Sequence, residues 1–177
     1  MVGVAGMRGR QTVRGMFQSL GVIMVAAGVM YLFIPHDEHA EPVKAKDYRV
    51  ELLTAQRAAP YPVLAPEGLG EGWKATVVSY KRERGDAWQL GFITPDTQYV
   101  AVNQSTAEPG KFVPEVTLKA KDTGKTQTVA GHVWQRWEGP KYDALVRTDG
   151  GATTVVTGTA SFERLAEMAG SLQSKKV

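Results

Sequence analysis

The chain has 177 residues, a formal net charge of +3 and no cysteine, and 22% of its residues are charged. The lack of cysteine excludes disulfides, thiolate nucleophiles, cysteine-ligated metal ions and lipid attachment through a thiol. Arg8, Arg10 and Arg14 contribute +3 and residues 35–46 contribute −1, so residues 47–177 carry only +1. Because a nearly neutral domain binds nucleic acid poorly, we expect no nucleic-acid partner.

The N-terminal region contains an uncharged apolar stretch that begins at Met16 and ends at Ile34. As a helix, its 19 residues span roughly 28 Å, close to the ~30 Å hydrocarbon thickness of a bilayer. The stretch therefore predicts one transmembrane helix over residues 16–34, with the membrane as a partner. A cleaved signal peptide is the alternative. The apolar run exceeds the ~7–15 residues of a signal core, however, and Glu38 stands where cleavage after Ala40 requires a small residue.

Charge on either side of the stretch predicts its orientation. The three arginines precede it without an acidic residue among them, whereas acidic residues follow it at once. Because basic flanks stay in the cytoplasm, we expect a cytoplasmic N-terminus over residues 1–15 and a polar linker over residues 35–46. Residues 47–177 then form a single extracytoplasmic domain, and the expected location is the cell membrane.

The first half of this domain predicts one helix and three strands. Residues 48–59 fit both a strand and a helix pattern, and a short helix is favoured. Arg84-Gly85-Asp86 matches an integrin-binding tripeptide, but hairpin-turn chemistry explains it better. Alternating side chains and tight turns predict antiparallel strands over residues 73–83, 88–93 and 99–102.

The second half predicts a short helix, four strands and a closing helix. The short helix covers residues 109–119 with an interruption at Pro114, and a polar turn follows over residues 121–125. Ser161 as N-cap and an apolar stripe from Phe162 to Leu172 predict the closing helix. The strands are expected over residues 126–129, 132–137, 142–148 and 152–157. The predicted fold class is α+β, with an antiparallel sheet of about seven strands in meander order and helices packed on one face.

No catalytic or metal motif is complete in this sequence. Gly124 begins a Gly-Lys-Thr run, but Lys119 stands where a phosphate-binding loop requires glycine. Neither a G-x-S-x-G nor an S-x-x-K signature occurs. His36 and His39 are competent metal ligands, but a juxtamembrane linker organises them poorly. We therefore expect no catalytic residue, no metal site and no cofactor.

The densest group of recognition side chains surrounds the Gly139-Pro140 turn. Two readings stay open, namely a surface for a ligand or partner, or ordinary cross-strand packing beside solvated charges. Trp134 and Trp137 point to opposite faces of one strand, so one of them is expected in the core. The candidate binding residues are Trp137, Glu138, Lys141, Tyr142 and Asp143.

Several segments together resemble one family. They are FIPHD at 33–37, APYPV at 59–63, GW at 72–73, GDAW at 85–88, EGPKYD at 138–143 and GATTVVTGTA at 151–160. The combination resembles the actinobacterial membrane-anchored proteins grouped as domain of unknown function 4245. The resemblance implies an envelope protein with one N-terminal span, and it implies no established activity and no catalytic residues.

Three functions are consistent with these features. The favoured one is a non-enzymatic envelope module that binds a protein or wall component near the membrane, because catalytic motifs are lacking and the tether is short. The alternative is a carrier with an apolar pocket for a lipid-like molecule between the closing helix and the sheet. An unrecognised hydrolase that uses Asp143 or Glu138 is the third.

Overall fold

A computed structural model of the chain describes residues 9–33 and 46–174. The chain divides into two units, Met1–Pro42 and Val43–Val177, and each is described by itself. Most of the predicted linker lies outside the described residues. Its last residue, Lys46, donates its backbone N–H to the carbonyl oxygen of Ala75 at 2.8 Å and so belongs structurally to the domain.

The first unit contains helix α1, Gly9–Phe33, which covers most of the predicted apolar stretch. Its large apolar side chains are exposed along the whole stretch from Met16 to Tyr31. Among the residues that the structure describes, no helix combines the length and the apolar character needed to cross a membrane. Residues 9–33 thus form a helix, and the transmembrane span within this region stays a prediction.

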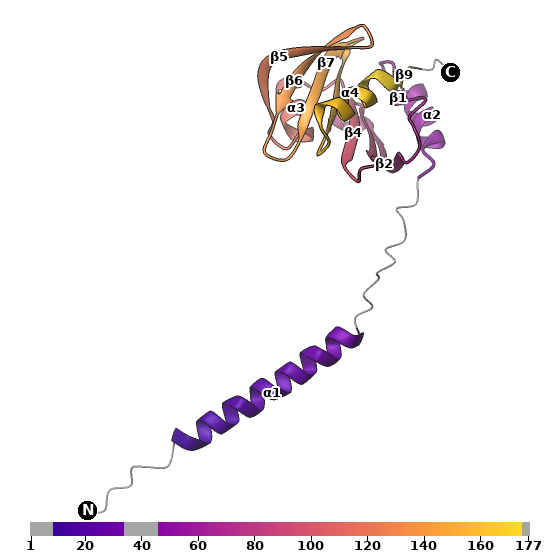
Figure 1. Cartoon of the computed structure of the whole chain (residues 1–177). Helices are drawn as coiled ribbons and strands as arrows, with labels where there is room; N and C mark the ends of the chain where they lie inside the picture. The colour runs from indigo at the N-terminus through magenta and orange to yellow at the C-terminus, as the bar shows by residue number, and fades with distance from the viewer. Residues whose placement is uncertain (1–8, 34–45, 175–177) are drawn as a thin grey trace, which may run out of the picture. The chain divides into compact units, whose positions relative to one another are not determined.

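The domain is built on a seven-stranded antiparallel sheet in the order β2-β3-β4-β8-β7-β6-β5 (Figure 1). The α+β class and the number of strands in this sheet are as predicted. The strands are β2 (Lys74–Lys81), β3 (Ala87–Ile93), β4 (Tyr99–Ser105), β5 (Lys121–Val129), β6 (His132–Glu138), β7 (Asp143–Asp149) and β8 (Ala152–Gly158).

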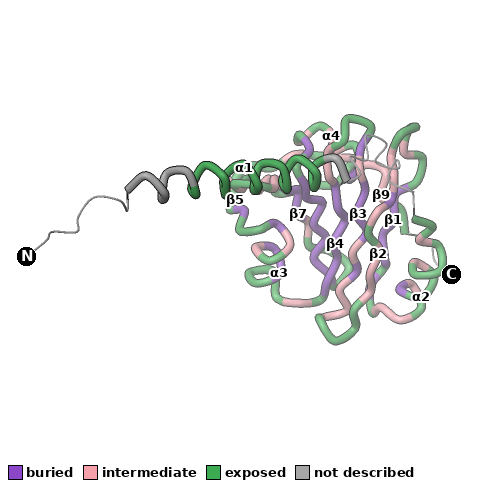
Figure 2. The backbone as a smooth tube through the Cα atoms, turned by 90° about the horizontal axis from the view of Figure 1, so that it is seen from below, coloured by how far each residue is buried: buried purple, intermediate pink, exposed green. Residues whose placement is uncertain are grey.

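The predicted meander order is wrong, because the last strand lies in the middle of the sheet. β2-β3-β4 and β5-β6-β7-β8 are separate meanders, and β8 returns to pair with β4 through Val102 and Val156. All seven residues of β8 are buried. A strand buried on both faces requires neighbours on both sides and layers above and below, which an edge position does not offer. Figure 2 shows the buried backbone concentrated in the central strands.

The polar turn predicted over residues 121–125 is also wrong, because these residues form the first half of edge strand β5. Its register with β6 is irregular between Asp122 and Thr126. The Asp122 carboxylate accepts the N–H of Gly124 at 2.8 Å, and the Thr123 hydroxyl donates to the carbonyl oxygen of Arg136 at 2.7 Å. The turn-forming side chains therefore make a bulge inside a strand instead of a reversal.

The helices cover both faces of the sheet, which corrects the expectation of one covered face. The helices of the domain are α2 (Arg49–Ala58), α3 (Pro109–Val116) and α4 (Phe162–Ser171), and η1 (Arg82–Arg84) is a short 3-10 turn. Leu165 of α4 packs in one core cluster with Leu145 and Val156. Phe112 of α3 packs in another with Ala144, Val146 and Val155. Neighbouring strand residues point to opposite faces, so β7 and β8 supply both clusters. We call these the α4 face and the α3 face.

The α4 face is closed by an extended segment that precedes the sheet. Its residues Ala65–Pro66 form β1, which pairs with β9 (Leu172–Gln173) after α4. The Gln104 side chain accepts the N–H of Leu64 at 2.7 Å and donates to the carbonyl oxygen of Pro62 at 3.3 Å. The Trp88 indole N–H donates to the carbonyl oxygen of Leu64 at 3.0 Å. These bonds satisfy the backbone of a buried, non-helical segment.

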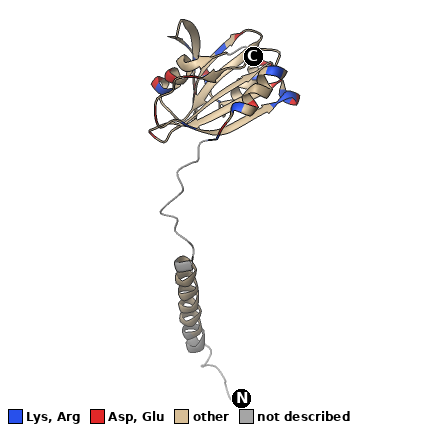
Figure 3. Ribbon diagram, turned by 90° about the vertical axis from the view of Figure 1, so that its right-hand side faces the viewer, with Lys and Arg blue, Asp and Glu red and all other residues tan. Residues whose placement is uncertain are grey.

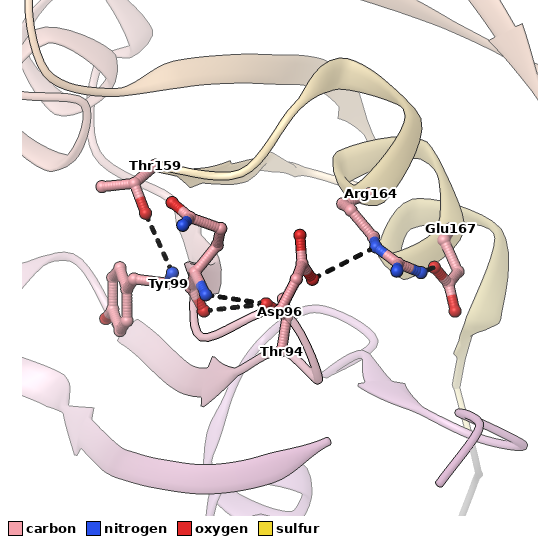
Figure 4. A network of polar contacts seen from close by, with 7 residues as sticks. Thr94, Asp96, Tyr99, Thr159, Arg164 and Glu167 are labelled. Carbon is pink, nitrogen blue, oxygen red and sulfur yellow. Dashed lines mark hydrogen bonds and ion pairs between the residues drawn. The ribbon is translucent and has the colours of Figure 1, made fainter. Parts of the chain in front are cut away.

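The β3–β4 turn is tied to the C-terminal part of the chain by a network of polar contacts (Figure 4). Arg164 of α4 lies 3.4 Å from the Asp96 carboxylate and 2.7 Å from that of Glu167. At the start of β4 the Tyr99 N–H donates to the Thr159 hydroxyl at 3.0 Å. The Arg164–Asp96 ion pair holds the β3–β4 turn against α4, and the Tyr99–Thr159 hydrogen bond holds the start of β4 against the segment that follows β8.

Candidate functional site

A groove with a volume of about 660 Å³ lies on the α3 face, between α3 and strands β2, β3 and β4. We call it the α3 groove. It exists because α3 has only eight residues and its buried side chains contact β7 and β8. Over β3 and β4 the same face carries the small residues Ala87, Gly91 and Ala101. Volumes of this size are typical of sites that bind a small molecule or a short segment of chain.

The centre of the groove floor is polar. Ser79, Gln89 and Asn103 are direct neighbours across β2, β3 and β4, and all three line the groove. Asn103 is only 3% exposed, yet its carboxamide makes no hydrogen bond to another described residue. Buried carboxamides are nearly always hydrogen-bonded. The Asn103 carboxamide atoms are not fully shielded from solvent, so the floor offers the groove a donor and an acceptor that the fold itself does not use.

One end of the groove is basic. Lys81 ends β2, Arg84 lies in η1 and Lys111 lies in the first turn of α3. The turn of the β2–β3 hairpin is hydrogen-bonded to the chain that leads into α3, since the Ser105 hydroxyl donates to the carbonyl oxygen of Gly85 at 2.6 Å. Figure 3 shows that charge gathers on loops and helices while most of the sheet is uncharged.

A cationic side chain is available to a ligand only where it is not already held in a strong ion pair. Lys111 lies 3.3 Å from Glu108, and both side chains are largely exposed, so this pair is weak. Lys81 and Arg84 have no ion-pair partner among the described residues. The only acidic side chain that lines the groove in the described part of the chain is Glu115.

The opposite end of the groove is aromatic. The rings of Tyr99 and Tyr142 lie 5.9 Å apart between centroids at an angle of 34°. Burial raises the pKa of Tyr99, and the neighbouring Tyr142 adds to the increase. The Lys141 ammonium lies 5.6 Å from the centre of the Tyr142 ring. These two rings close this end, and Phe112 of α3 lines the groove as well.

A family model matches residues 8–172, which is nearly the whole chain. Its description is "Protein of unknown function (DUF4245)". The chain belongs to the DUF4245 family. A comparison with curated proteins found no match. The resemblance drawn from the sequence segments is therefore confirmed, and the function of this DUF4245 protein has to be argued from its own geometry.

The structure separates the five residues that the sequence proposed as a site. Tyr142 lines the α3 groove, and Lys141 stands beside it. Trp137 packs against the α3 cluster, and its indole N–H is buried without a hydrogen-bond partner among the described residues. Glu138 is exposed at the end of β6, and the Asp143 carboxylate accepts the N–H of Gly139 at 3.2 Å. Trp134 is the core tryptophan, 1% exposed on the α4 face.

Sequence reasoning missed the residues of this DUF4245 domain that shape the groove, above all Tyr99, Asn103 and Arg84. Tyr99 and Asn103 lie in a strand that looked ordinary by itself, and Arg84 was explained by hairpin-turn chemistry. The available signal was the repeated small residue on one side of β3 and β4, which predicts a hollow surface. Within the described residues no three His, Asp or Glu side chains gather as metal ligands, and His36 and His39 lie outside those residues.

Proposed function

We propose that this DUF4245 protein is a membrane-anchored, non-enzymatic binding module and that the α3 groove is its ligand site. The observation that carries the proposal is the Asn103 carboxamide, which is 3% exposed, lines the groove and lacks a hydrogen-bond partner among the described residues. Its polar atoms keep some contact with solvent, so one hydrogen bond from a ligand contributes about 0.5–1.5 kcal/mol there. A ligand that pairs with the Asn103 carboxamide gains that free energy, whereas the fold itself makes no hydrogen bond with this side chain among the described residues.

Binding explains the groove better than hydrolysis does. Among the described residues that line it, Glu115 is the single carboxylate and no histidine is present. Two carboxylates facing one cleft are the minimum for the hydrolytic mechanism considered for Glu138 and Asp143. The Asp143 carboxylate is instead bonded to the backbone of its own turn.

The lipid-carrier alternative uses the same groove. Between α4 and the sheet, where the sequence suggested a pocket, Leu165 and Met168 are fully buried and fill the interface. The apolar wall of the α3 groove, formed by Phe112 and Val116, favours this alternative. The polar row on the groove floor opposes it, because a hydrocarbon chain leaves the carboxamides unpaired.

The membrane anchor is proposed from the sequence and from the exposed side chains of α1. Apolar side chains stand out on all sides of this helix, which is unfavourable in water and favourable in lipid. The arginines before it favour a cytoplasmic N-terminus. Proteolysis of intact cells is expected to remove the domain and leave the anchor. Full protection of the domain, with an accessible N-terminus, would overturn this orientation.

A blocked groove tests the binding function. The full chain, purified in detergent from its membranes, is expected to carry a bound species detectable by native mass spectrometry. Ser79→Trp fills the groove from its β2 side, and the bound species is expected to disappear. Val77→Trp is the matched control, because Val77 lies two residues earlier on the same strand, is 36% exposed and does not line the groove. Retention of the species by Ser79→Trp would contradict the proposal.

A further inference from the structure

The charges at the basic end of the α3 groove favour an anionic group. Arg84 offers a planar guanidinium that matches a carboxylate with two parallel hydrogen bonds. Lys81, which is paired with Ala87 at the neighbouring end of the β2–β3 hairpin, adds a second cation at the same end. Neither has an ion-pair partner in the part of the chain that the structure describes. A carboxylate placed here gains two charge-assisted contacts without displacing an existing pair.

The polar row along the floor favours a peptide over a hydrocarbon. A carboxamide carries one acceptor and one donor group, which is the complement of a peptide group with its N–H and C=O. Gln89 and Asn103 present two carboxamides side by side across the β3–β4 pairing, and neither side chain is hydrogen-bonded to another described residue. An extended peptide brings such groups at regular intervals, whereas an acyl chain brings none.

The aromatic end favours an apolar side chain. Tyr99 and Tyr142 close this end, and Phe112 and Val116 give the groove an apolar lining from α3. Glu115 lies on the same helix as these wall residues, at the side of the groove, and disfavours a second anion there. The order along the groove is therefore cation, carboxamide row and apolar wall.

We infer that the α3 groove binds a short extended peptide segment with a carboxylate at its Lys81 and Arg84 end and an apolar side chain against Tyr99 and Tyr142. This inference rests on the proposed binding function. The carboxylate comes either from a chain terminus or from an acidic side chain, and the chemistry that recognises it is the same. The peptide lies with its backbone along the carboxamides of Gln89 and Asn103.

Selection from random short peptides displayed on phage tests the inference with the full chain in detergent. The enriched peptides are expected to combine an acidic residue with an apolar one at a fixed spacing. The double variant Lys81→Glu, Arg84→Glu is expected to bind the selected peptides about tenfold or more weakly, and selection on it is expected to enrich basic peptides instead. The matched control reverses Lys121 and Lys125 on edge strand β5, which do not line the groove.

Synthetic versions of a selected peptide separate the two sources of the carboxylate. One version carries an acidic side chain and an amidated C-terminus, and the other carries a free C-terminus and no acidic side chain. Stronger binding of either version, reduced by the double variant, supports the inference and names the source. Equal binding by a neutral version, amidated and without acidic residues, would overturn it.

The remaining outcomes distinguish this inference from the proposed function. If Ser79→Trp abolishes binding but the selected peptides show no acidic preference, the groove is the ligand site and the inferred ligand is wrong. The same holds if no peptide is enriched and lysophosphatidylglycerol binds wild type but not Ser79→Trp. If Ser79→Trp changes the binding of neither peptides nor lipid, both the inference and the proposed function fail.

Discussion

The ring of Tyr99 lies across Gly91 of the neighbouring strand, so that a Cβ atom at residue 91 would come within 2.7 Å of the tyrosine hydroxyl oxygen. The ring atom Cε2 would be 3.0 Å from the same Cβ. The missing side chain therefore gives Tyr99 room to lie flat on β3. In this position its ring closes the aromatic end of the α3 groove.

Gly91→Ala is expected to displace the Tyr99 ring and to destabilise the domain by about 1–3 kcal/mol, as overpacking of a buried site does. Urea unfolding of the full chain in detergent measures the change. In a Tyr99→Ala background the same substitution should cost much less, because the clashing ring is gone. Equal costs in both backgrounds would show that this contact does not determine the effect.

Gly158→Ala is expected to have a larger effect, because the clash is with backbone. A Cβ at residue 158 would lie 1.9 Å from the carbonyl oxygen of Tyr99, inside the β4–β8 pairing. We expect a loss above about 3 kcal/mol or failure to fold. Gly110→Ala in α3 is the control, since its nearest neighbouring atom is Glu108 Oε1 at 3.6 Å, and it should be neutral or stabilising by about 0.4–1 kcal/mol. Similar losses for both variants would contradict the prediction.

Asn103 and Gln104 provide a matched pair, because they are adjacent on β4 and each is 3% exposed. Gln104 is bonded to Leu64, Pro62 and Thr154 on the α4 face. Asn103→Leu should leave the free energy of unfolding unchanged or raise it, since it removes an amide that makes no hydrogen bond to another described residue. Gln104→Leu should lower the free energy of unfolding by about 1–3 kcal/mol, because it orphans the Leu64 N–H.

Chemical denaturation and ligand binding, measured on both variants, complete this test. If the groove is the ligand site, Asn103→Leu loses affinity without losing stability. A destabilised Asn103→Leu variant would show that the asparagine serves the fold, and the proposed role of the groove would lose its main support.

Asp143 and Glu138 differ in what they do for the β6–β7 turn. The Asp143 carboxylate accepts the Gly139 N–H, so Asp143→Ala is expected to lower the free energy of unfolding by about 0.5–1.5 kcal/mol. Glu138 is exposed, and Glu138→Ala should stay within about 0.5 kcal/mol of wild type. Asp143→Asn keeps an acceptor oxygen and should recover part of the loss. Thermal unfolding of the three variants checks the order.

Alkaline pH is expected to destabilise the domain through tyrosines that contact Asp86. Burial and the hydrogen bond to the Asp86 carboxylate, 2.7 Å long, raise the pKa of Tyr80 to about 12. Burial also raises the pKa of Tyr61, whose hydroxyl donates to the Asp86 carbonyl oxygen. A raised folded-state pKa stabilises the fold fully below the unfolded value of about 10, and this contribution is lost as pH rises through the folded value.

The melting temperature should therefore fall from about pH 10 upward. Asp86→Asn removes the charge that raises the Tyr80 pKa while tolerating the positive φ of 50° at this residue. Between about pH 10 and 12 the melting temperature of the Asp86→Asn variant should fall less steeply than that of wild type. The tyrosinate absorbance of the variant should appear at lower pH. Identical curves for the two proteins would contradict the assignment to Asp86.

The sequence by itself determined the local elements of this protein. Alternation and turn residues located the strands, and the apolar stripe after Ser161 located α4 almost to the residue. It also determined the family through short segments. Local signals suffice here because strand and helix periodicities depend on neighbouring residues only. Of the proposed site residues, Tyr142 lies in the groove for a reason the sequence did not contain, namely its contact with Tyr99.

Only the tertiary structure decided the strand order, the two covered faces and the groove. Strand alternation turns Val155 and Val156 to opposite faces, and only the placement of β8 in the middle of the sheet gives each of them a core cluster to pack in. The groove depends on which strands the short helix α3 leaves uncovered. Asn103 becomes 3% exposed only when distant segments pack around it, because burial is a property of the packed chain and not of any stretch within it.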